Sequence, residues 1–219
     1  MYGEPNHNPS GLVLLSMKQL CEPTFTPAVS PDLLPTYRSI ARWITSYLMS
    51  AHPDLGRAGD VCPFTAQALR LDTIRIGVSS ATSAHTAIIK SGMHDCFRQF
   101  ALIPAAKSMQ HFRTIIVGFP GINDAKGLEH LKIVQARLKF YCLLRGLMIG
   151  RFHAGSNDPG LWNPDFRPLR SPIPLLAIRE VVENDAPFAM RHPLLIPAYV
   201  WKYPLAAPKR LLAHLLKRR

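Results

Sequence analysis

The chain has 219 residues, of which 47% are hydrophobic and 18% charged, a composition typical of one globular domain with a buried core. Its formal net charge is +12, and seven of the basic residues follow Asp185, after which there is no acidic residue. Four widely spaced cysteines without a CxxC pair disfavour a zinc ribbon and a disulfide framework. No apolar run approaches the roughly 20 residues of a membrane span, and no secretory signal pattern is visible, so we expect a cytoplasmic protein.

The first third of the chain predicts an extended arm followed by one helix. Residues 1–30 are rich in Pro, Asn, Ser and Thr, which favours an arm laid on the domain surface. Apolar residues from Leu33 to Leu48 recur every three or four positions, and Pro53 ends the predicted helix that they mark. Residues 65–69 favour a short helix.

The middle and last thirds predict a sheet with packed helices. We expect strands at 73–78, 112–119, 147–152 and 173–182, a mixed segment at 82–103 with a helix around 94–102, a long helix from about 123 to 145, a short helix at 194–202 and a basic helical tail. This order favours an α+β fold with a small, mostly antiparallel sheet of about four or more strands. We divide the chain into an arm (1–30), a single α+β domain (31–205) and a basic C-terminal tail (206–219).

The connection between the last two predicted strands is the strongest candidate for a functional segment. Residues 153–172 read HAGSNDPGLWNPDFRPLRSP, and connections of that length are usually either functional or disordered. Leu161, Trp162 and Phe166 are too apolar for a disordered loop in water, and four prolines stiffen its path. We therefore predict a rigid, preorganised loop.

Four arginines lie in or beside this loop: Arg151, Arg167, Arg170 and Arg179. The two aspartates of the loop, Asp158 and Asp165, can pair with only some of them. Because the planar guanidinium binds carboxylate or phosphate through two hydrogen bonds, the excess of arginine predicts an anionic ligand. The alternative is that the arginines brace the loop through backbone carbonyls and the two aspartates.

Two further side chains are candidates for chemistry. His153 stands where a strand ends and the loop begins, a position suited to a metal or haem ligand or to a general base, although a hydrogen-bonded structural histidine is the alternative. Cys62 precedes Pro63, and such a pair can present a thiolate to haem iron, but most buried cysteines are small hydrophobic residues. The chain has no GxGxxG, GxxxxGK[ST], HExxH or GxSxG motif, which disfavours nucleotide-dependent and hydrolytic enzymes.

Three stretches, residues 59–64, 146–153 and 159–179, resemble a bacterial domain family of unassigned function that is often encoded near specialised-metabolite genes. The resemblance covers roughly residues 35–205. That family is in turn distantly similar to YqcI/YcgG-type proteins, some of which are haem-dependent oxygenases that hydroxylate nitrogen or carbon of amino acids. The shared features are an early Cys-Pro-Phe turn, a central helix and a late strand that ends in a loop.

The resemblance implies a haem-dependent monooxygenase acting on an amino-acid or amine-type small molecule. His153 is then the expected iron ligand, with Cys62 as an alternative. Arg167 and Arg170 would pair with the haem propionates or a substrate carboxylate. The remaining substrate-binding candidates are Arg151, Arg179, Trp162 and Phe166.

Two other classes of function stay open. The second hypothesis is a cofactor-free enzyme or binding protein that holds an anionic metabolite with the arginines. A third hypothesis is a non-catalytic partner of a biosynthetic enzyme. The basic tail suits an acidic carrier protein, a redox partner or a membrane surface. Specific nucleic-acid binding is disfavoured because no aromatic residue interleaves with the final basic run.

Overall fold

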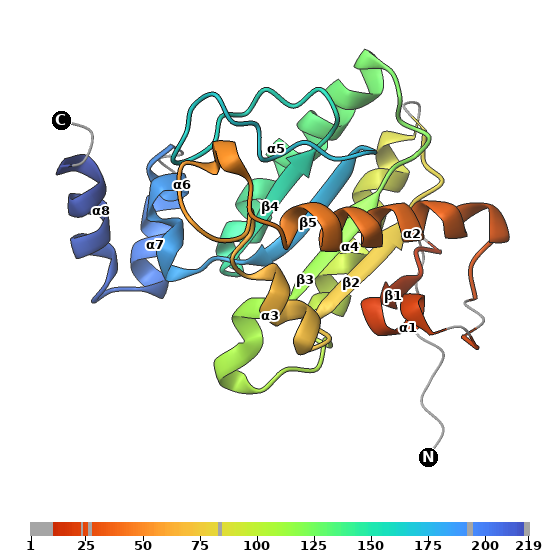
Figure 1. Ribbon diagram of the computed structural model, residues 1–219, viewed down its shortest axis with the longest axis horizontal. Coiled ribbons are helices and arrows are strands. Elements are labelled where there is room, and N and C mark those ends of the chain that lie inside the picture. The colour runs from red at the N-terminus through yellow and green to blue at the C-terminus, as the bar shows by residue number, and fades with distance from the viewer. Residues whose placement is uncertain (1–10, 23, 26–27, 83–84, 192–194, 217–219) are drawn as a thin grey trace.

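The computed structural model describes residues 11–22, 24–25, 28–82, 85–191 and 195–216. Its centre is a five-stranded sheet with the strand order β1-β2-β3-β5-β4 (Figure 1). The strands are β1 (Leu14–Ser16), β2 (Ile74–Val78), β3 (Thr114–Gly118), β4 (Leu147–Phe152) and β5 (Leu175–Glu180). Only β2 and β3 pair in parallel, and the other three pairings are antiparallel. The predicted α+β fold with a mostly antiparallel sheet is therefore confirmed.

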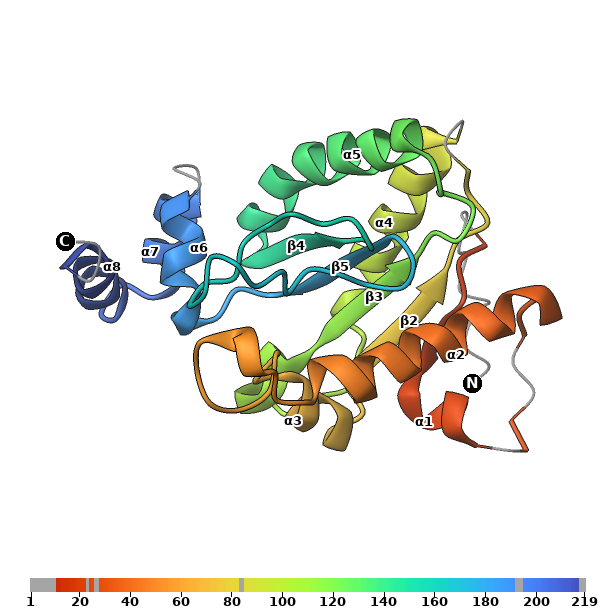
Figure 2. The same cartoon turned by 45° about the horizontal axis from the view of Figure 1, so that its top comes forward.

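Helices cover both faces of the sheet (Figure 2). One face carries α4 (Thr86–Phe100) and α5 (Ala125–Leu144), and the other carries α1 (Met17–Cys21), α2 (Leu34–Trp43) and α3 (Thr65–Arg70). Strand alternation explains the two layers, because successive side chains leave a strand on opposite faces. Ile115 and Val117 of β3 pack into the α4–α5 core, whereas Ile116 between them packs against α2.

Shorter helical segments complete these layers. A π-helical segment (Ile44–Leu48) continues α2, and 3-10 turns lie at Pro31–Leu33, Pro53–Leu55, Lys107–Phe112 and Glu183–Asp185. Beyond the end of β5, α6 (Ala186–Arg191), α7 (Leu195–Lys202) and α8 (Ala207–Leu216) pack into a third cluster, which projects from one end of the sheet in Figure 1. Among the described helices, none is long and apolar enough to cross a membrane.

The N-terminal segment departs from the predicted surface arm. Leu14–Ser16 pairs with β2 and forms an edge strand of the sheet, and Leu12, Leu15 and Met17 are buried. The Tyr37 hydroxyl of α2 donates a hydrogen bond of 2.8 Å to the Val13 carbonyl and ties the segment to the helix layer. A strand of three residues is too short to show a periodic pattern in the sequence, so only its tertiary pairing reveals it.

Helix α4 also begins earlier than predicted, at Thr86 rather than near residue 94. Its buried positions include Ile89, Met93, Cys96 and Phe100, which recur at helical spacing over the whole length of the helix. Gly92 interrupts this stripe in the sequence and weakens the helical pattern there.

Replacing Leu15 by alanine tests whether the N-terminal segment belongs to the core. The buried side chain is 3% exposed, so we expect Leu15→Ala to lower the free energy of unfolding by about 2–5 kcal/mol in urea denaturation. Lys18→Ala, at an exposed position two residues after Ser16, serves as the control and is expected to change stability by about 0.5 kcal/mol or less. If both substitutions changed the free energy of unfolding by the same small amount, the segment would lie on the surface and not in the core.

Candidate functional site

The loop between β4 and β5 turns back from the end of β4 toward the α6 end of the sheet and then returns to the start of β5 (Figure 1). It makes hydrogen bonds within itself along this path. The His153 amide donates to the Leu169 carbonyl at 3.2 Å, and the Gly160 amide donates to the Phe166 carbonyl at 2.8 Å. The loop is thus an ordered segment that folds back on itself, with its base at His153 and its tip near Trp162.

A row of five rings, which we term the aromatic row, supports the loop from base to tip. Phe152 at the end of β4 meets Trp43 edge-on with ring centroids 5.5 Å apart, and Trp43 stacks on Tyr47 at 6.1 Å. Tyr47 meets His52 at 6.5 Å, and His52 meets Phe166 of the loop at 4.6 Å. Three of the five rings come from α2 and the segment that follows it, so this region forms the floor on which the loop packs.

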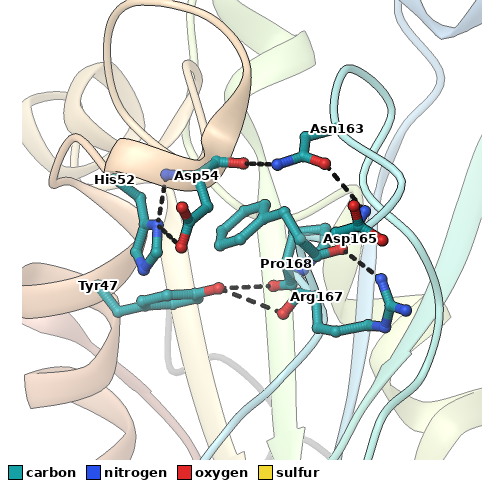
Figure 3. A network of polar contacts seen from close by, with 8 residues as sticks. Tyr47, His52, Asp54, Asn163, Asp165, Arg167 and Pro168 are labelled. Carbon is teal, nitrogen blue, oxygen red and sulfur yellow. Dashed lines mark hydrogen bonds and ion pairs between the residues drawn. The ribbon is translucent and has the colours of Figure 1, made fainter.

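The same aromatic side chains hold the loop backbone through their polar atoms. The Trp43 indole Nε1 donates to the Arg170 carbonyl at 3.1 Å. The Tyr47 hydroxyl lies 3.5 Å from the Arg167 carbonyl and 3.4 Å from the Pro168 carbonyl, as Figure 3 shows, and donates a long, shared hydrogen bond to them. Without these hydrogen bonds, the Trp43 N–H group, the Tyr47 hydroxyl and the loop carbonyls would be unsatisfied beneath the loop.

The tip of the loop is fixed on the segment that follows the π-helix. The Asn163 side-chain amide donates to the Asp54 carbonyl at 2.9 Å, and its oxygen accepts from the Asp165 amide at 2.9 Å (Figure 3). Gly56, with φ of +76°, allows the backbone of Trp162 to approach closely, since an added Cβ would lie 3.0 Å from its carbonyl carbon. Both ends of the loop are therefore docked on α2 and the residues after it.

Two of the four predicted arginines act as braces. Arg167 donates to the carbonyls of Pro164 and Phe166, both within the loop. Arg179 forms a two-pronged ion pair with Asp185, with nitrogen–oxygen distances of 2.7 and 2.8 Å, and so ties β5 to the C-terminal helices. The structure thus matches the bracing alternative at Arg167, whereas Arg179 pairs with an acid outside the loop.

The other two arginines lie near the base of the loop: Arg151 is on β4 two residues before His153, and Arg170 follows Leu169, whose carbonyl accepts from the His153 amide. Arg151 donates to the Leu128 carbonyl of α5 at 3.4 Å, and Arg170 donates through Nε to the Ser156 carbonyl at 3.3 Å. Within the described part of the chain, no carboxylate lies at salt-bridge distance from either guanidinium. The base of the loop therefore carries two cations that are not neutralised by a paired acid.

Burial lowers the pKa of His153 below its usual 6.5, the positive charge of Arg151 lowers it further, and Asp158 partly offsets both. The imidazole is therefore neutral at pH 7. Its Nδ1 atom is buried and has no hydrogen-bond partner among the described residues. A buried, unsatisfied polar atom of this kind needs an explanation, and a ligand or an ordered water is the usual one.

Lys139 of α5 belongs to the same region, and the sequence did not single it out. Burial lowers the pKa of Lys139, and Asp158 of the loop partly offsets that effect. The spacing along α5 places Lys139 among the solvent-facing positions, so only the folded loop reveals its neighbours. We call Arg151, His153, Lys139, Asp158 and Arg170 the base cluster.

The remaining predicted site residues lie elsewhere. Cys62 is half-buried and close enough to Arg179 to interact with its charge. Arg179 is four residues along β5 from Leu175, the partner of Phe152, which is a separation of roughly 13 Å. Cys62 and His153 therefore lie toward opposite ends of the sheet. Trp162 is 54% exposed on the outside of the loop tip.

These residues do not fit a haem group in the arrangement that the resemblance implies. An axial histidine normally donates its other ring nitrogen to a carbonyl or carboxylate, and His153 Nδ1 has no such partner among the described residues. The Arg167 side chain donates to a carbonyl within the loop. Phe166 is only 6% exposed and packs against His52, so it does not line an open pocket. We therefore derive no chemistry through haem.

Two cavities between described residues lie away from His153. One of about 90 Å³ lies between the ends of β2 and β3 and helix α4, lined by Ser79, Met93 and Phe119 among others. Another of about 10 Å³ lies between the end of α5 and α6–α7. Pockets for drug-sized ligands hold roughly 300–1,000 Å³, so neither of these two accommodates a macrocycle.

The fold and the docked loop define an α+β domain whose candidate site is a polar cluster at the end of an edge strand. The chain matches a family described as a domain of unknown function, DUF6875, over residues 37–213. Because this match covers most of the chain, the protein belongs to the DUF6875 family. The match does not connect the family to haem-dependent oxygenases. No curated protein and no solved structure matches the chain.

Two glycine substitutions test whether the tip of the loop is docked on Gly56. Gly56 and Gly59 both have positive φ, so Gly56→Ala and Gly59→Ala share a backbone cost of about 1–2 kcal/mol. Only at Gly56 does the added Cβ meet the loop, since at Gly59 the nearest atom is a flexible arginine nitrogen at 3.6 Å. We expect the Gly56 variant to lose more stability and to be cleaved faster by chymotrypsin at Trp162.

Equal losses of stability and equal cleavage rates in the two variants would contradict the docking of the tip. Urea denaturation of both variants measures the first quantity, and mass spectrometry of the fragments assigns the cleavage to the loop.

Proposed function

We propose that the protein binds a small molecule carrying a carboxylate or phosphate group at the base cluster. The observation that carries this proposal is the charge of the cluster, in which Arg151, Arg170 and Lys139 oppose the single acid Asp158. With His153 neutral, the local formal charge is +2. An anion bound there would pair with Arg151 and Arg170, which have no carboxylate at salt-bridge distance among the described residues.

The donors of the cluster suit such a ligand. An arginine has five N–H donors, and Arg151 and Arg170 each use one in a hydrogen bond to a backbone carbonyl. Both guanidinium groups therefore retain donors for the two oxygens of a carboxylate or phosphate. His153, neutral and with a buried unsatisfied nitrogen, can exchange a hydrogen bond or a proton with the ligand.

The docked loop supplies the rigidity that such a site requires. The backbone of Arg170 is held by the Trp43 indole, and the backbone of His153 is held by the Leu169 carbonyl. A ligand therefore meets side chains whose backbone is already ordered, which reduces the entropy that binding must overcome. This proposal corresponds to the anionic-metabolite hypothesis derived from the sequence.

Haem-dependent oxygenation stays a prediction from the resemblance, and the arrangement of His153, Arg167 and Phe166 does not support it. An absorption spectrum recorded after addition of haemin distinguishes the two candidates, because anion binding alone produces no Soret band. A partner role for the basic C-terminal tail is independent of both.

Thermal stabilisation by simple anions tests the proposal. We expect phosphate, citrate and sulfate to raise the melting temperature in a saturable manner. Removing a hydrogen bond to a charged group costs about 1.5–3 kcal/mol, so Arg170→Gln should weaken sulfate binding by about tenfold to a hundredfold. Arg38→Gln, an exposed arginine on α2, is the matched control and should bind sulfate as the native protein does.

The pH dependence provides a second readout of the same experiment. Sulfate keeps its charge between pH 8 and 5, whereas His153 gains a proton only as the pH falls below its lowered pKa. Sulfate binding should therefore tighten at acidic pH, and His153→Gln should remove this increase. Non-saturable stabilisation that is the same in native protein, Arg170→Gln and Arg38→Gln would reflect a general salt effect and contradict the site.

A further inference from the structure

We propose that the C-terminal helices α7 and α8 dock the protein on the surface of an anionic lipid membrane. The proposal rests on a feature remote from the base cluster and is independent of the function proposed above. It concerns Trp201, Leu205 and Leu212, which we term the C-terminal apolar patch, and the basic residues beside them.

The patch consists of large apolar side chains that are mostly exposed. Trp201 is 90% exposed, Leu205 is 88% exposed and Leu212 is 57% exposed. A single exposed leucine is ordinary on a protein surface, but an exposed tryptophan with two leucines on consecutive elements is not. Their exposure indicates a surface that is covered by something else when the protein functions.

The exposure does not arise from a loose attachment of the helices. The Tyr199 hydroxyl of α7 donates to the Glu183 carbonyl, and the Tyr203 hydroxyl donates to the Val181 carbonyl at 2.8 Å. Lys202 donates to the Gly146 carbonyl and pairs with Glu180 at 3.1 Å. The residues on either side of Trp201 and Leu205 are thus anchored to the body.

Helix α8 separates an inward face from an outward one. Ala207 is fully buried and Leu211 packs against the third core cluster, whereas Lys209, Leu212 and Arg210 are exposed. Figures 1 and 2 both place α8 at the outer end of the molecule, beyond α6 and α7, where a flat surface can approach it. Exposed apolar and exposed basic side chains therefore both occur at this end of the molecule.

Charge identifies the covering surface as anionic. No acidic residue follows Asp185, whereas Lys209 and the final residues Lys217, Arg218 and Arg219 are basic. Arg210 is also basic, but it pairs with Glu183 at 2.8 Å. Basic residues next to exposed tryptophan and leucine are the combination found where helices lie in the interface of anionic lipids. Tryptophan favours this interface because its ring is apolar and its N–H group is polar.

The length of α8 is consistent with lying along a membrane and not across it. It has ten residues, which is about half of the roughly 20 that a membrane-spanning helix requires. An acidic protein domain could also attract the basic residues, but attraction of that kind does not require the exposed tryptophan and leucines. Binding to a membrane should therefore require the C-terminal apolar patch, whereas binding to an acidic protein domain should not.

Sedimentation of the full chain with lipid vesicles tests the proposal. We expect the protein to bind vesicles of phosphatidylglycerol and to bind vesicles of phosphatidylcholine at least about tenfold more weakly. Trp201→Ala combined with Leu205→Ala should reduce binding to phosphatidylglycerol by about tenfold or more, because both side chains would enter the lipid interface. Lys209→Glu should also reduce it.

The matched control combines Trp162→Ala with Leu102→Ala, which removes the same two types of exposed side chain from other parts of the surface. This variant should bind vesicles as the native protein does, and circular dichroism should show all variants to be folded. Failure to bind phosphatidylglycerol vesicles would overturn the proposal. Binding that persists without Trp201 and Leu205 would also overturn it, as would binding to polyglutamate in place of vesicles, which would indicate an acidic protein partner.

Discussion

The packing of the β4–β5 loop onto the aromatic row is the interaction on which the candidate site depends. Trp43, Tyr47 and His52 form a floor between Phe152 at the end of β4 and Phe166 of the loop. Trp43 and Tyr47 also bind the loop backbone through polar atoms. Trp43 and Tyr47 are four residues apart across the start of the π-helical segment, whose i→i+5 hydrogen bonds change the spacing at which side chains share a face. Without this floor, the loop would have to bury its apolar side chains elsewhere.

The docked loop divides the arginines of the region into two groups. Arg167 and Arg179 are used to maintain the fold, because the first closes the loop on its own carbonyls and the second joins β5 to Asp185. Arg151 and Arg170 lie near the base of the loop and have no acidic partner at salt-bridge distance in the described residues. Composition alone does not distinguish these roles, whereas the hydrogen-bond partners do, and the proposed anion site follows from the second group.

The sequence was sufficient to predict the elements in which apolar residues recur with a clear period, and to predict where the loop lies. The four predicted strands, the long helix α5 and the order of the loop were all visible as local patterns. The partners of the loop were not, because Trp43 and Arg170 are 127 residues apart and Asp54 and Asn163 are 109 apart. Lys139 was missed for the same reason, since its relation to Asp158 exists only once the loop is folded.

Hydrogen exchange of the loop amides tests the central claim most directly. The His153 and Gly160 amides donate to the Leu169 and Phe166 carbonyls, so both should exchange as slowly as amides within β4 and β5. Trp43→Ala should accelerate exchange at these two positions and leave the amides of α4 unchanged. Exchange of both amides at the rate of an unstructured chain in the native protein would contradict a docked, preorganised loop.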